Sequence, residues 1–577
     1  MSVIAVNQLC KSFGKGAGRR DALKNISFAI AEGSMNALIG PDGAGKTTLL
    51  RLLAGILRPD AGAARVLGHR LPEEALQLQS RIGYMPQRFG LYENLTVEEN
   101  LTLFADLHQI PKPLRKTRID ELLTMTALGP FRTRRAGKLS GGMKQKLGLA
   151  CTLIYPPQVL LLDEASVGVD PISRRELWSI IRQQVEREKV TVLMSTAYMD
   201  EAERCDHVLL LHEGEILAQG SPAELIAPIA GHSFLLEDPS IPPRTLQSQV
   251  ARLPGVADTA IQGEALRIVM DTDEEPLLPP ELAVHGRAKP VTARLEDAFV
   301  SLLFRRSPHH AVPLPPVLES QAIQKPVVEV KSLFRYFGAF AAVKDVSFSV
   351  HKGEIFGLLG ANGAGKSTTF RMLCGLLPAS AGTLQVASQN LRTGKASARA
   401  HIGYVSQKFS LYGALSVLQN LNFFATVYGL QGRRRQDRIA WALEELELDD
   451  YISMNAADLP LGFKQRLALA CALMHEPSIL FLDEPTSGVD PLARREFWAR
   501  VNALAHGGTT CLVTTHFMEE AEYCDRLVLM SLGEVLAEGT PREIKNRARR
   551  ADMPSPSMED AFISLIEEHE RASRRAS

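Results

Sequence analysis

Short runs of apolar residues alternate along the chain with longer segments in which apolar residues recur at helical spacing. The runs MNALIG and EIFGLLG each predict a buried strand, and the segments TTLLRLLAGIL and STTFRMLCGLL that follow them predict helices. Farther along, VLLLDE and ILFLDE each place four apolar residues before an Asp-Glu pair, which predicts a second buried strand. Strands and helices that alternate in this way are typical of an α/β fold.

The whole pattern occurs twice. GPDGAGKTTLLRLLAGILRPDAG recurs as GANGAGKSTTFRMLCGLLPASAG, and Lys46 and Lys366 within them are 320 residues apart. The register holds over a long span, and by Ala197 and His516 the separation has changed only to 319. Such a long repeat indicates duplication of a domain rather than a short-period solenoid.

The repeat predicts how the chain is divided into domains. We expect residues 1–220 and 327–545 to form the two copies, each followed by a segment of its own. Residues 221–306 contain HSFLLE, PRTLQSQVARLPGV and ALRIVM, which predict a strand, a helix and a strand in a small α+β appendage. Residues 307–326 are rich in proline and predict an extended linker. Residues 546–577 predict a C-terminal helix and a tail.

A second, shorter repeat closes each half. LEDAFVSLLF and MEDAFISLIEE both carry apolar residues at helical spacing, so each predicts a short amphipathic helix that packs against its own domain. The final residues, RASRRAS after Glu570, predict a disordered tail.

Length and composition exclude several classes of protein. A chain of 577 residues is too long for one hydrophobic core. Lys+Arg and Asp+Glu are both 65, so no surplus of basic charge indicates a nucleic-acid partner. No apolar run is long enough to predict a transmembrane helix, and the N-terminus does not resemble a signal peptide. The seven cysteines are scattered, which favours small core residues in a reducing compartment and argues against a metal site.

Both glycine-rich turns match the pattern GxxxxGK[ST] and lie between a strand and a helix, the context that a phosphate-binding loop requires. Glycines let successive backbone N–H groups point at the phosphates, and the helix N-terminus adds a favourable dipole. The alternative, a glycine-rich turn with a surface lysine, is disfavoured because this context occurs twice. We therefore expect the lysines to reach the β- and γ-phosphates and the hydroxyls after them to ligate Mg²⁺. The predicted nucleotide-binding residues are Gly40, Gly43, Gly45, Lys46, Thr47 and Thr48 in the first copy, and Gly360, Gly363, Gly365, Lys366, Ser367 and Thr368 in the second.

The Asp-Glu pairs that end the second predicted strand are typical of a Walker B motif. We expect Asp163 and Asp483 to hold Mg²⁺, and Glu164 and Glu484 to polarise the attacking water. An apolar run that ends in two acids is weak evidence by itself. In both copies, however, the aspartate follows the loop lysine by 117 residues, which strengthens the assignment.

The order of motifs resembles the ABC ATPase family. LSGGMKQKLGLA resembles the signature motif, the turns YMPQ and YVSQ resemble the Q-loop, and TTHFMEEAE resembles the switch-histidine region. The resemblance implies two tandem P-loop ABC ATPase domains, each with a RecA-like core and a helical signature subdomain. It further implies ATP as the ligand and ATP hydrolysis as the reaction. The residues that it assigns are Phe13 and Phe337 against adenine, Gln87 and Gln407 against Mg²⁺, Ser140, Gly141 and Gly142 in the signature, and His516 as the switch histidine.

Within that family the chain is similar to the tandem ATPase subunits of bacterial ABC-2-type exporters, the YbhF-like branch of the daunorubicin-resistance group. This implies separate ABC-2 permease subunits as partners, with a periplasmic adaptor as a further candidate, and a peripheral position on the cytoplasmic face of the inner membrane. The surface after each Q-loop would receive the permease helices. Apolar pairs there are Phe89 with Leu91 and Phe409 with Leu411, for which ordinary core packing is the alternative.

Two positions depart from the family pattern. The second signature is LPLGFKQRL, so Pro460 and Leu461 stand where the first copy has serine and glycine, and Ala197 stands where the switch histidine is expected. ABC domains pair head to tail, so both changes fall on the composite site that contains Lys46. We therefore expect that site to bind ATP and hydrolyse it poorly. Two alternatives are that Pro460 merely starts a helix and that Tyr198 replaces the missing histidine.

Two other functions share this architecture. One is the tandem ATPase of a sugar importer, which differs little in sequence. The other is a ribosome-associated tandem ABC factor, which typically has a long, charged helical linker. Residues 221–326 instead hold nine Lys+Arg, 13 Asp+Glu and 15 of the 33 prolines, which argues against that role.

Overall fold

The computed structural model describes most of the chain, in two compact units. The predicted linker 307–326 lies outside the described residues apart from Pro326, and so do Phe89 and Phe409. Among the helices of the described part, none is both long and apolar enough to cross a membrane. The described residues are 2–14, 19–87, 90–237, 243–263, 265–280, 287–306, 326–387, 389–391, 398–407, 410–550 and 553–576.

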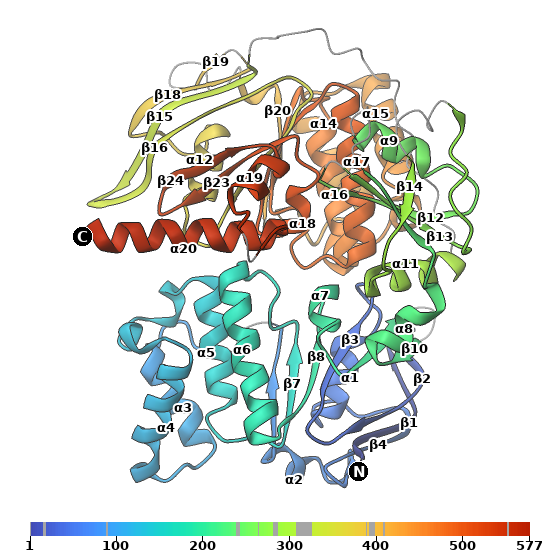
Figure 1. The fold of residues 1–577 in the computed structure, drawn as a ribbon, viewed down its shortest axis with the longest axis vertical. Helices are drawn as coiled ribbons and strands as arrows, with labels where there is room; N and C mark the ends of the chain where they lie inside the picture. Colours follow the sequence, from blue (N-terminus) through green and yellow to red (C-terminus); the bar gives the residue numbers. More distant parts are fainter. Residues whose placement is uncertain are drawn as a thin grey trace. The chain divides into compact units, whose positions relative to one another are not determined.

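A mixed sheet forms the core of the first unit (Figure 1). β3, β6, β7, β8 and β9 pair in parallel, and β10 pairs antiparallel with β9. β3 and β7 are buried along their whole length, as expected for parallel strands covered on both faces, and the prediction of strands in MNALIG and VLLLDE is confirmed. The strand order is β10 (Glu215–Gly220), β9 (His207–His212), β3 (Met35–Ile39), β8 (Thr191–Ser195), β7 (Val159–Asp163) and β6 (Ile82–Met85).

An antiparallel sheet lies beside this core. One apolar cluster joins Leu49 and Leu53 of α1 (Lys46–Leu53) with Ile4 of the antiparallel sheet and Leu161 of the core sheet, so the helix after the glycine-rich turn is packed between the two sheets. The antiparallel order is β2 (Arg20–Ala31), β1 (Ser2–Phe13), β4 (Ala61–Val66) and β5 (His69–Leu71). The other helices of this copy are α2 (Ala75–Gln79), α3 (Val97–Leu107), α4 (Lys112–Met125), α5 (Gly141–Thr152), α6 (Pro171–Glu188) and α7 (Met199–Ala202).

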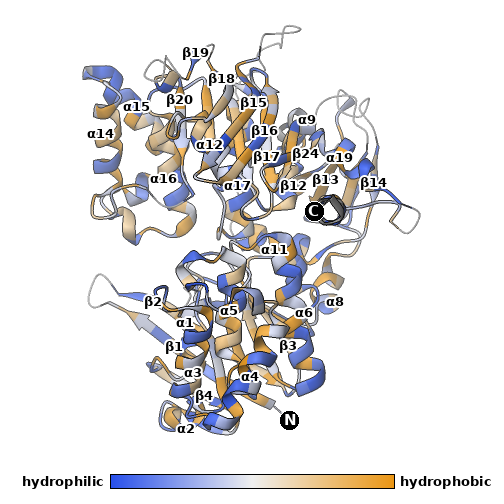
Figure 2. Ribbon diagram, turned by 90° about the vertical axis from the view of Figure 1, so that its left-hand side faces the viewer, coloured by the Kyte–Doolittle hydropathy of each residue, from blue (hydrophilic) through white to orange (hydrophobic). Residues whose placement is uncertain are grey.

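The second unit repeats this topology. In Figure 2, β17 is coloured predominantly hydrophobic, in agreement with its complete burial. Its core order is β20 (Ile402–Val405), β21 (Ile479–Asp483), β22 (Thr510–Thr515), β17 (Ile355–Gly360), β23 (Arg526–Ser531) and β24 (Glu534–Gly539), and its antiparallel order is β16 (Phe340–Val350), β15 (Val328–Phe337), β18 (Ala381–Val386) and β19 (Gln389–Asn390). Its helices include α12 (Lys366–Leu373), α14 (Val417–Val427), α15 (Gly432–Glu445), α16 (Leu461–Leu473), α17 (Pro491–His506), α18 (Met518–Ala521) and α19 (Pro541–Arg547).

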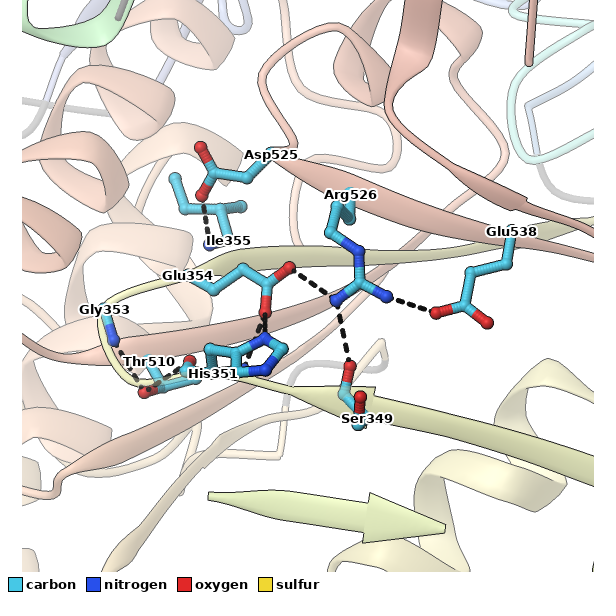
Figure 3. Close-up of polar contacts among 9 residues, drawn as sticks. All are labelled: Ser349, His351, Gly353, Glu354, Ile355, Thr510, Asp525, Arg526 and Glu538. Atoms are coloured by element: carbon cyan, nitrogen blue, oxygen red, sulfur yellow. Dashed lines mark hydrogen bonds and ion pairs between the residues drawn. The ribbon is translucent and has the colours of Figure 1, made fainter. Parts of the chain in front are cut away.

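A network of polar contacts ties the two sheets of the second unit together (Figure 3). Arg526, at the start of β23, donates to Glu354 and to the carbonyl of Ser349 in β16, at 3.2 Å in each case, and also pairs with Glu538 of β24. Glu354 is only 8% exposed, so the guanidinium stabilises a carboxylate that burial would otherwise penalise. This network lies at the opposite end of β17 from the glycine-rich turn.

The predicted α+β appendage contains a small sheet in the order β12, β13, β11, β14. The prediction of strand, helix and strand is confirmed by β11 (Ser233–Leu236), α9 (Pro243–Val250) and β13 (Ala265–Met270), and the structure adds β12 (Val256–Gln262) and β14 (Ala288–Pro290). From Phe234 onward this sheet belongs to the second unit, although it follows the first copy in sequence. Asn502 of α17 donates to Gln247 of α9 at 3.2 Å, and Tyr523 packs against the apolar core of the sheet. The domain boundaries given above stay predictions.

The closing helices α11 (Leu295–Arg306) and α20 (Met558–Ala576) pack within their own units. α11 contacts α7, α8 (Pro222–Ile226) and the 3-10 turn Ala227–Ile229, whereas α20 contacts α18, α19, β23 and β24, so that prediction is confirmed.

The prediction of a disordered tail is wrong, because α20 continues to Ala576. Arg571 pairs with Glu567 one turn earlier at 2.8 Å. The last residues also contain no glycine or proline that would end the helix.

Candidate ATP sites

The two glycine-rich turns have nearly identical backbones. Gly45 and Gly365 precede α1 and α12 with φ of 106° and 100°, a conformation that favours glycine. A Cβ on Gly45 would lie 2.4 Å from the carbonyl oxygen of Ala22, so a larger residue would not fit there. Each turn therefore places a helix N-terminus and its backbone N–H groups at the end of a buried strand.

The lysine of each turn is buried inside its loop. Lys46 Nζ donates to the carbonyl oxygens of Gly40 at 2.7 Å and Pro41 at 3.2 Å. Lys366 makes the same pair of contacts, at 2.6 Å to Gly360 and 3.1 Å to the next carbonyl. The two ammonium groups are thus held where phosphate oxygens would meet them.

The Walker B carboxylates of the first copy lie beside this turn. Thr47 Oγ1 donates to Asp163 Oδ1 at 3.1 Å, and Gln87 Nε2 donates to Glu164 Oε2 at 2.6 Å. Lys46 Nζ lies 3.8 Å from the other oxygen of Glu164. Burial raises the pKa of Glu164, although the nearby ammonium opposes that shift. The structure brings together these five predicted residues from three separate segments of the chain.

In the second copy a histidine changes the environment of the catalytic carboxylate. Gln407 Nε2 donates to Glu484 Oε2 at 2.6 Å, and His516 Nδ1 lies 3.2 Å from the same oxygen. Burial opposes ionisation of Glu484, but the nearby His516 imidazole, together with Lys366 and Gln407, outweighs it and holds the pKa of this carboxyl below its ordinary value. Burial raises the pKa of Asp483. The pKa values of the two predicted catalytic glutamates are therefore shifted in opposite directions.

The Tyr198 ring packs against an arginine, as the Phe517 ring does in the second copy. The guanidinium carbon of Arg174 lies 4.5 Å from the centre of the Tyr198 ring, and that of Arg494 lies 4.2 Å from the centre of the Phe517 ring. Tyr198 therefore has the place of Phe517, the residue after the switch position, in the first copy.

The two signature segments begin their helices differently. Ser140 caps α5, because its hydroxyl accepts a hydrogen bond from the backbone N–H of Met143 at 3.3 Å. Pro460 occupies the N-cap position of α16, where it offers neither a side-chain acceptor nor a backbone N–H. The helix starts at the same place in both copies, so the interpretation that Pro460 starts a helix is compatible with the fold. Proline does not supply the hydrogen bond that the serine hydroxyl makes in the first copy.

The remaining predicted residues lie at strand ends, in the glycine-rich turns or at the starts of helices. Phe13 and Phe337, at the ends of β1 and β15, are 44% and 48% exposed, so their rings are available for stacking. The predicted residues Gly43, Thr48, Gly141, Gly142, Gly363, Ser367 and Thr368 lie in the glycine-rich turns or in the first turns of α1, α5 and α12.

Sequence reasoning missed two hydroxyl residues that organise the carboxylates. Ser195, at the end of β8, donates to Asp163 at 2.9 Å and accepts from the backbone N–H of Glu164 at 2.9 Å. Thr514 does the same in the second copy, at 2.6 Å to Asp483 and 3.0 Å from the N–H of Glu484. A hydroxyl residue two positions before the switch position was the available signal.

The comparisons with known proteins agree with this geometry. The family model described as "ABC transporter" matches residues 23–167 and 343–487. The chain belongs to the ABC transporter family. It is an ATP-binding ATPase subunit of this family, which confirms the predicted fold class and enzyme activity.

Three relatives are similar to this chain over different shares of its length. The chain is 49% identical to the "Probable multidrug ABC transporter ATP-binding protein YbhF" of Escherichia coli (strain K12), over 99% of both chains. It is 36% identical to the "Nod factor export ATP-binding protein I" of Paraburkholderia xenovorans over 50% of this chain and 95% of that one. It is 38% identical to the "Linearmycin resistance ATP-binding protein LnrL" of Bacillus subtilis over 38% of this chain and 71% of that one. The predicted resemblance to the YbhF-like branch is confirmed.

Proposed function

We propose that this ATPase powers export of drugs, other amphipathic compounds or ions through separate ABC-2-type permease subunits, with a periplasmic adaptor as a further partner. The two complete sets of glycine-rich turn, Q-loop glutamine and Walker B pair carry the proposal. The functions in the names of the relatives, multidrug transport, Nod factor export and linearmycin resistance, support export rather than sugar import. We place the chain at the cytoplasmic face of the inner membrane, held there by its permeases.

The site residues would act on ATP as follows. The turn N–H groups with Lys46 and Lys366 bind the phosphates, and Phe13 and Phe337 stack on the adenines. Transition-state charge on the γ-phosphoryl group is met by these fixed donors, which need no reorganisation when the bond breaks. Glu484 accepts a proton from the attacking water, and its contacts with His516 and Gln407 hold it in place for that task.

The carboxylates also fit a divalent cation. Asp163 Oδ2 is buried and has no hydrogen-bond partner among the described residues, an arrangement that is costly unless a cation is bound there. Its other oxygen accepts from the Thr47 hydroxyl. Mg²⁺ would supply neutralisation of phosphate charge. The residues that would hold it are Thr47, Gln87 and Asp163 in the first copy and Ser367, Gln407 and Asp483 in the second.

The two composite sites are proposed to differ in turnover. If the copies pair head to tail, as the family resemblance implies, the site of Lys46 faces Pro460 and Leu461 and has Ala197 at its switch position. The site of Lys366 faces the Ser140 signature and has His516. The opposite pKa shifts of Glu164 and Glu484 support this division, because they reflect the imidazole that only Glu484 has beside it.

Recruitment to the membrane tests the partner assignment. Beside the Q-loops, Tyr92 and Tyr412 are 55% and 50% exposed, and Leu91 and Leu411 lie next to them half-buried. Expressed alone, the chain should stay in the supernatant after ultracentrifugation; expressed with its ABC-2 permeases, it should sediment with membranes. Tyr412→Glu should reduce that recovery. Leu76→Glu, at a position in α2 that is 86% exposed, is the control and should not. Sedimentation without permeases would contradict the proposal.

A further inference from the structure

A buried glutamate follows the switch position in each copy. Glu520, in α18, is 1% exposed and accepts hydrogen bonds from the hydroxyls of Thr486 and Thr515, the latter at 2.5 Å. Thr515 Oγ1 in turn accepts from the backbone N–H of Phe517 at 2.9 Å. The carboxylate therefore fixes the chain on both sides of His516.

The first copy contains a related arrangement. Glu201, in α7, is 1% exposed and accepts from Ser166 at 2.8 Å and from Thr196 at 2.5 Å, both at Oε2, and its Oε1 has no hydrogen-bond partner among the described residues. Thr196 Oγ1 accepts from the backbone N–H of Tyr198 at 3.0 Å. The bracketed residue here is Ala197, which has no side chain to orient.

The glutamate joins two loops that meet at the catalytic carboxylate. Thr486 lies two residues after Glu484, on the loop that follows β21. Thr515 lies between His516 and Thr514, and Thr514 contacts both Asp483 and the N–H of Glu484. One buried carboxylate thus connects the loop after the Walker B strand with the loop that carries the imidazole.

An ionised carboxylate suits this position better than an amide. It can accept at both oxygens, as Glu520 does, whereas a glutamine offers one acceptor and must place its NH₂ against the other hydroxyl. Arg494 Nε lies 3.9 Å from Glu520 and offsets part of the cost of burying the charge. Loss of one acceptor would leave a buried hydroxyl unsatisfied and free the loop to shift.

We propose that Glu520 is a positioning residue for hydrolysis at the second site, where it holds His516 against Glu484 by clamping Thr486 and Thr515. This rests on the proposed function, in which the second site performs most turnover. Glu201 accepts from the corresponding two hydroxyls in the first copy, both at one oxygen, and there it orients no imidazole. Glu201 is therefore the control: it is a buried glutamate at the corresponding position whose loss carries no catalytic cost.

Steady-state ATP hydrolysis by the full chain tests the proposal. Glu520→Gln should lower kcat by about tenfold or more with KM changed less than about twofold, because small displacements of a catalytic group cost rate rather than ground-state binding. Glu201→Gln should leave kcat within about twofold, because no imidazole depends on that carboxylate. The melting temperatures of both variants, measured by calorimetry, check that each chain is folded. Equal kcat losses in the two variants would overturn the proposal and assign both glutamates a purely structural role.

A smaller change covers the case in which Glu520→Gln does not fold. Thr486→Val removes one of the two hydroxyls that donate to Glu520 and should lower kcat. Thr486→Ser keeps the hydroxyl and should leave kcat near its natural value, because a serine, Ser166, makes the corresponding contact in the first copy. Loss of kcat in both variants, or in neither, would contradict the clamp.

A double-mutant cycle identifies the residue through which Glu520 acts. In a His516→Ala background, Glu520→Gln should cost less than about twofold further, because the group that it positions is gone. Multiplicative losses would refute the assignment. Glu484→Gln in the otherwise natural chain separates the two hypotheses: if it leaves turnover intact, the proposed second-site function fails, whereas a failed cycle with normal Glu484 dependence rejects only the clamp.

Discussion

Replacing each catalytic glutamate in turn gives the sharpest test of unequal ATP sites. Glu484→Gln removes the carboxylate that His516 and Gln407 hold in place, so it should abolish most turnover. Glu164→Gln removes the equivalent group where burial raises the pKa and Ala197 stands at the switch position, so it should cost little.

The magnitude follows from the role of a general base. A positioned base contributes about 10²- to 10⁴-fold to rate, so Glu484→Gln should lower kcat at least about 100-fold, which corresponds to about 2.7 kcal/mol of transition-state stabilisation. Glu164 has no imidazole partner, and its site is expected to face a signature in which Pro460 replaces the serine, so it should contribute much less. We therefore expect less than about a twofold loss from Glu164→Gln.

Steady-state phosphate release by the full chain is the assay, with nucleotide binding measured separately by fluorescence. Both glutamines keep the size of the side chain and its contact with the Q-loop glutamine, so ATP binding should persist in each variant. Equal losses of kcat from Glu164→Gln and Glu484→Gln would mean that the sites are catalytically equivalent, and the reasoning from Ala197 and Pro460 would be wrong.

Three further changes probe the same structure. Ser140→Pro should reproduce the turnover loss of Glu484→Gln, at least about 100-fold, if the signature acts across the paired copies; near-normal ATP hydrolysis would exclude that pairing. His516→Ala should move the acid side of the pH–rate profile to higher pH, because the imidazole that lowers the pKa of Glu484 is lost and burial then dominates. The natural carboxylate is active above its lowered pKa and loses activity as pH falls through it, so an unchanged profile would contradict this. Glu354→Gln should destabilise the second unit by about 1–3 kcal/mol, because Arg526 loses a buried partner; calorimetry should show a lower melting temperature with ATP binding retained.

The sequence predicted those parts of the sites that are encoded locally. Lys46 and Thr47 follow a glycine-rich turn whose backbone can adopt few conformations, and Glu164 ends an apolar strand that must be buried. In such segments the spacing alone places the side chain. The duplication strengthened each prediction, since Lys366 repeats the pattern.

Contacts between distant segments could not be predicted in this way. Nothing near Glu520 in the sequence indicates that its carboxylate meets Thr486, because that contact depends on β21 and β22 being neighbours in the sheet. The packing of the small sheet on α17 depends in the same way on a partner far along the chain: Gln247 meets Asn502 across 255 residues. Local propensity predicted the strands of that sheet and could not say which copy they would pack against.

The two copies surround their Walker B glutamates differently at the switch position. Glu164 and Glu484 each follow the corresponding buried strand of their copy and accept from a Q-loop glutamine at 2.6 Å. The backbone N–H of each donates to a hydroxyl, that of Ser195 or Thr514. The pKa values of the two glutamates nevertheless shift in opposite directions, and the imidazole of His516 is the main favourable contact that only one of them has. Burial raises the pKa of a carboxyl, and the imidazole of His516 opposes that effect in the second copy alone. We therefore expect the site with Ala197 to bind ATP and to hydrolyse it slowly.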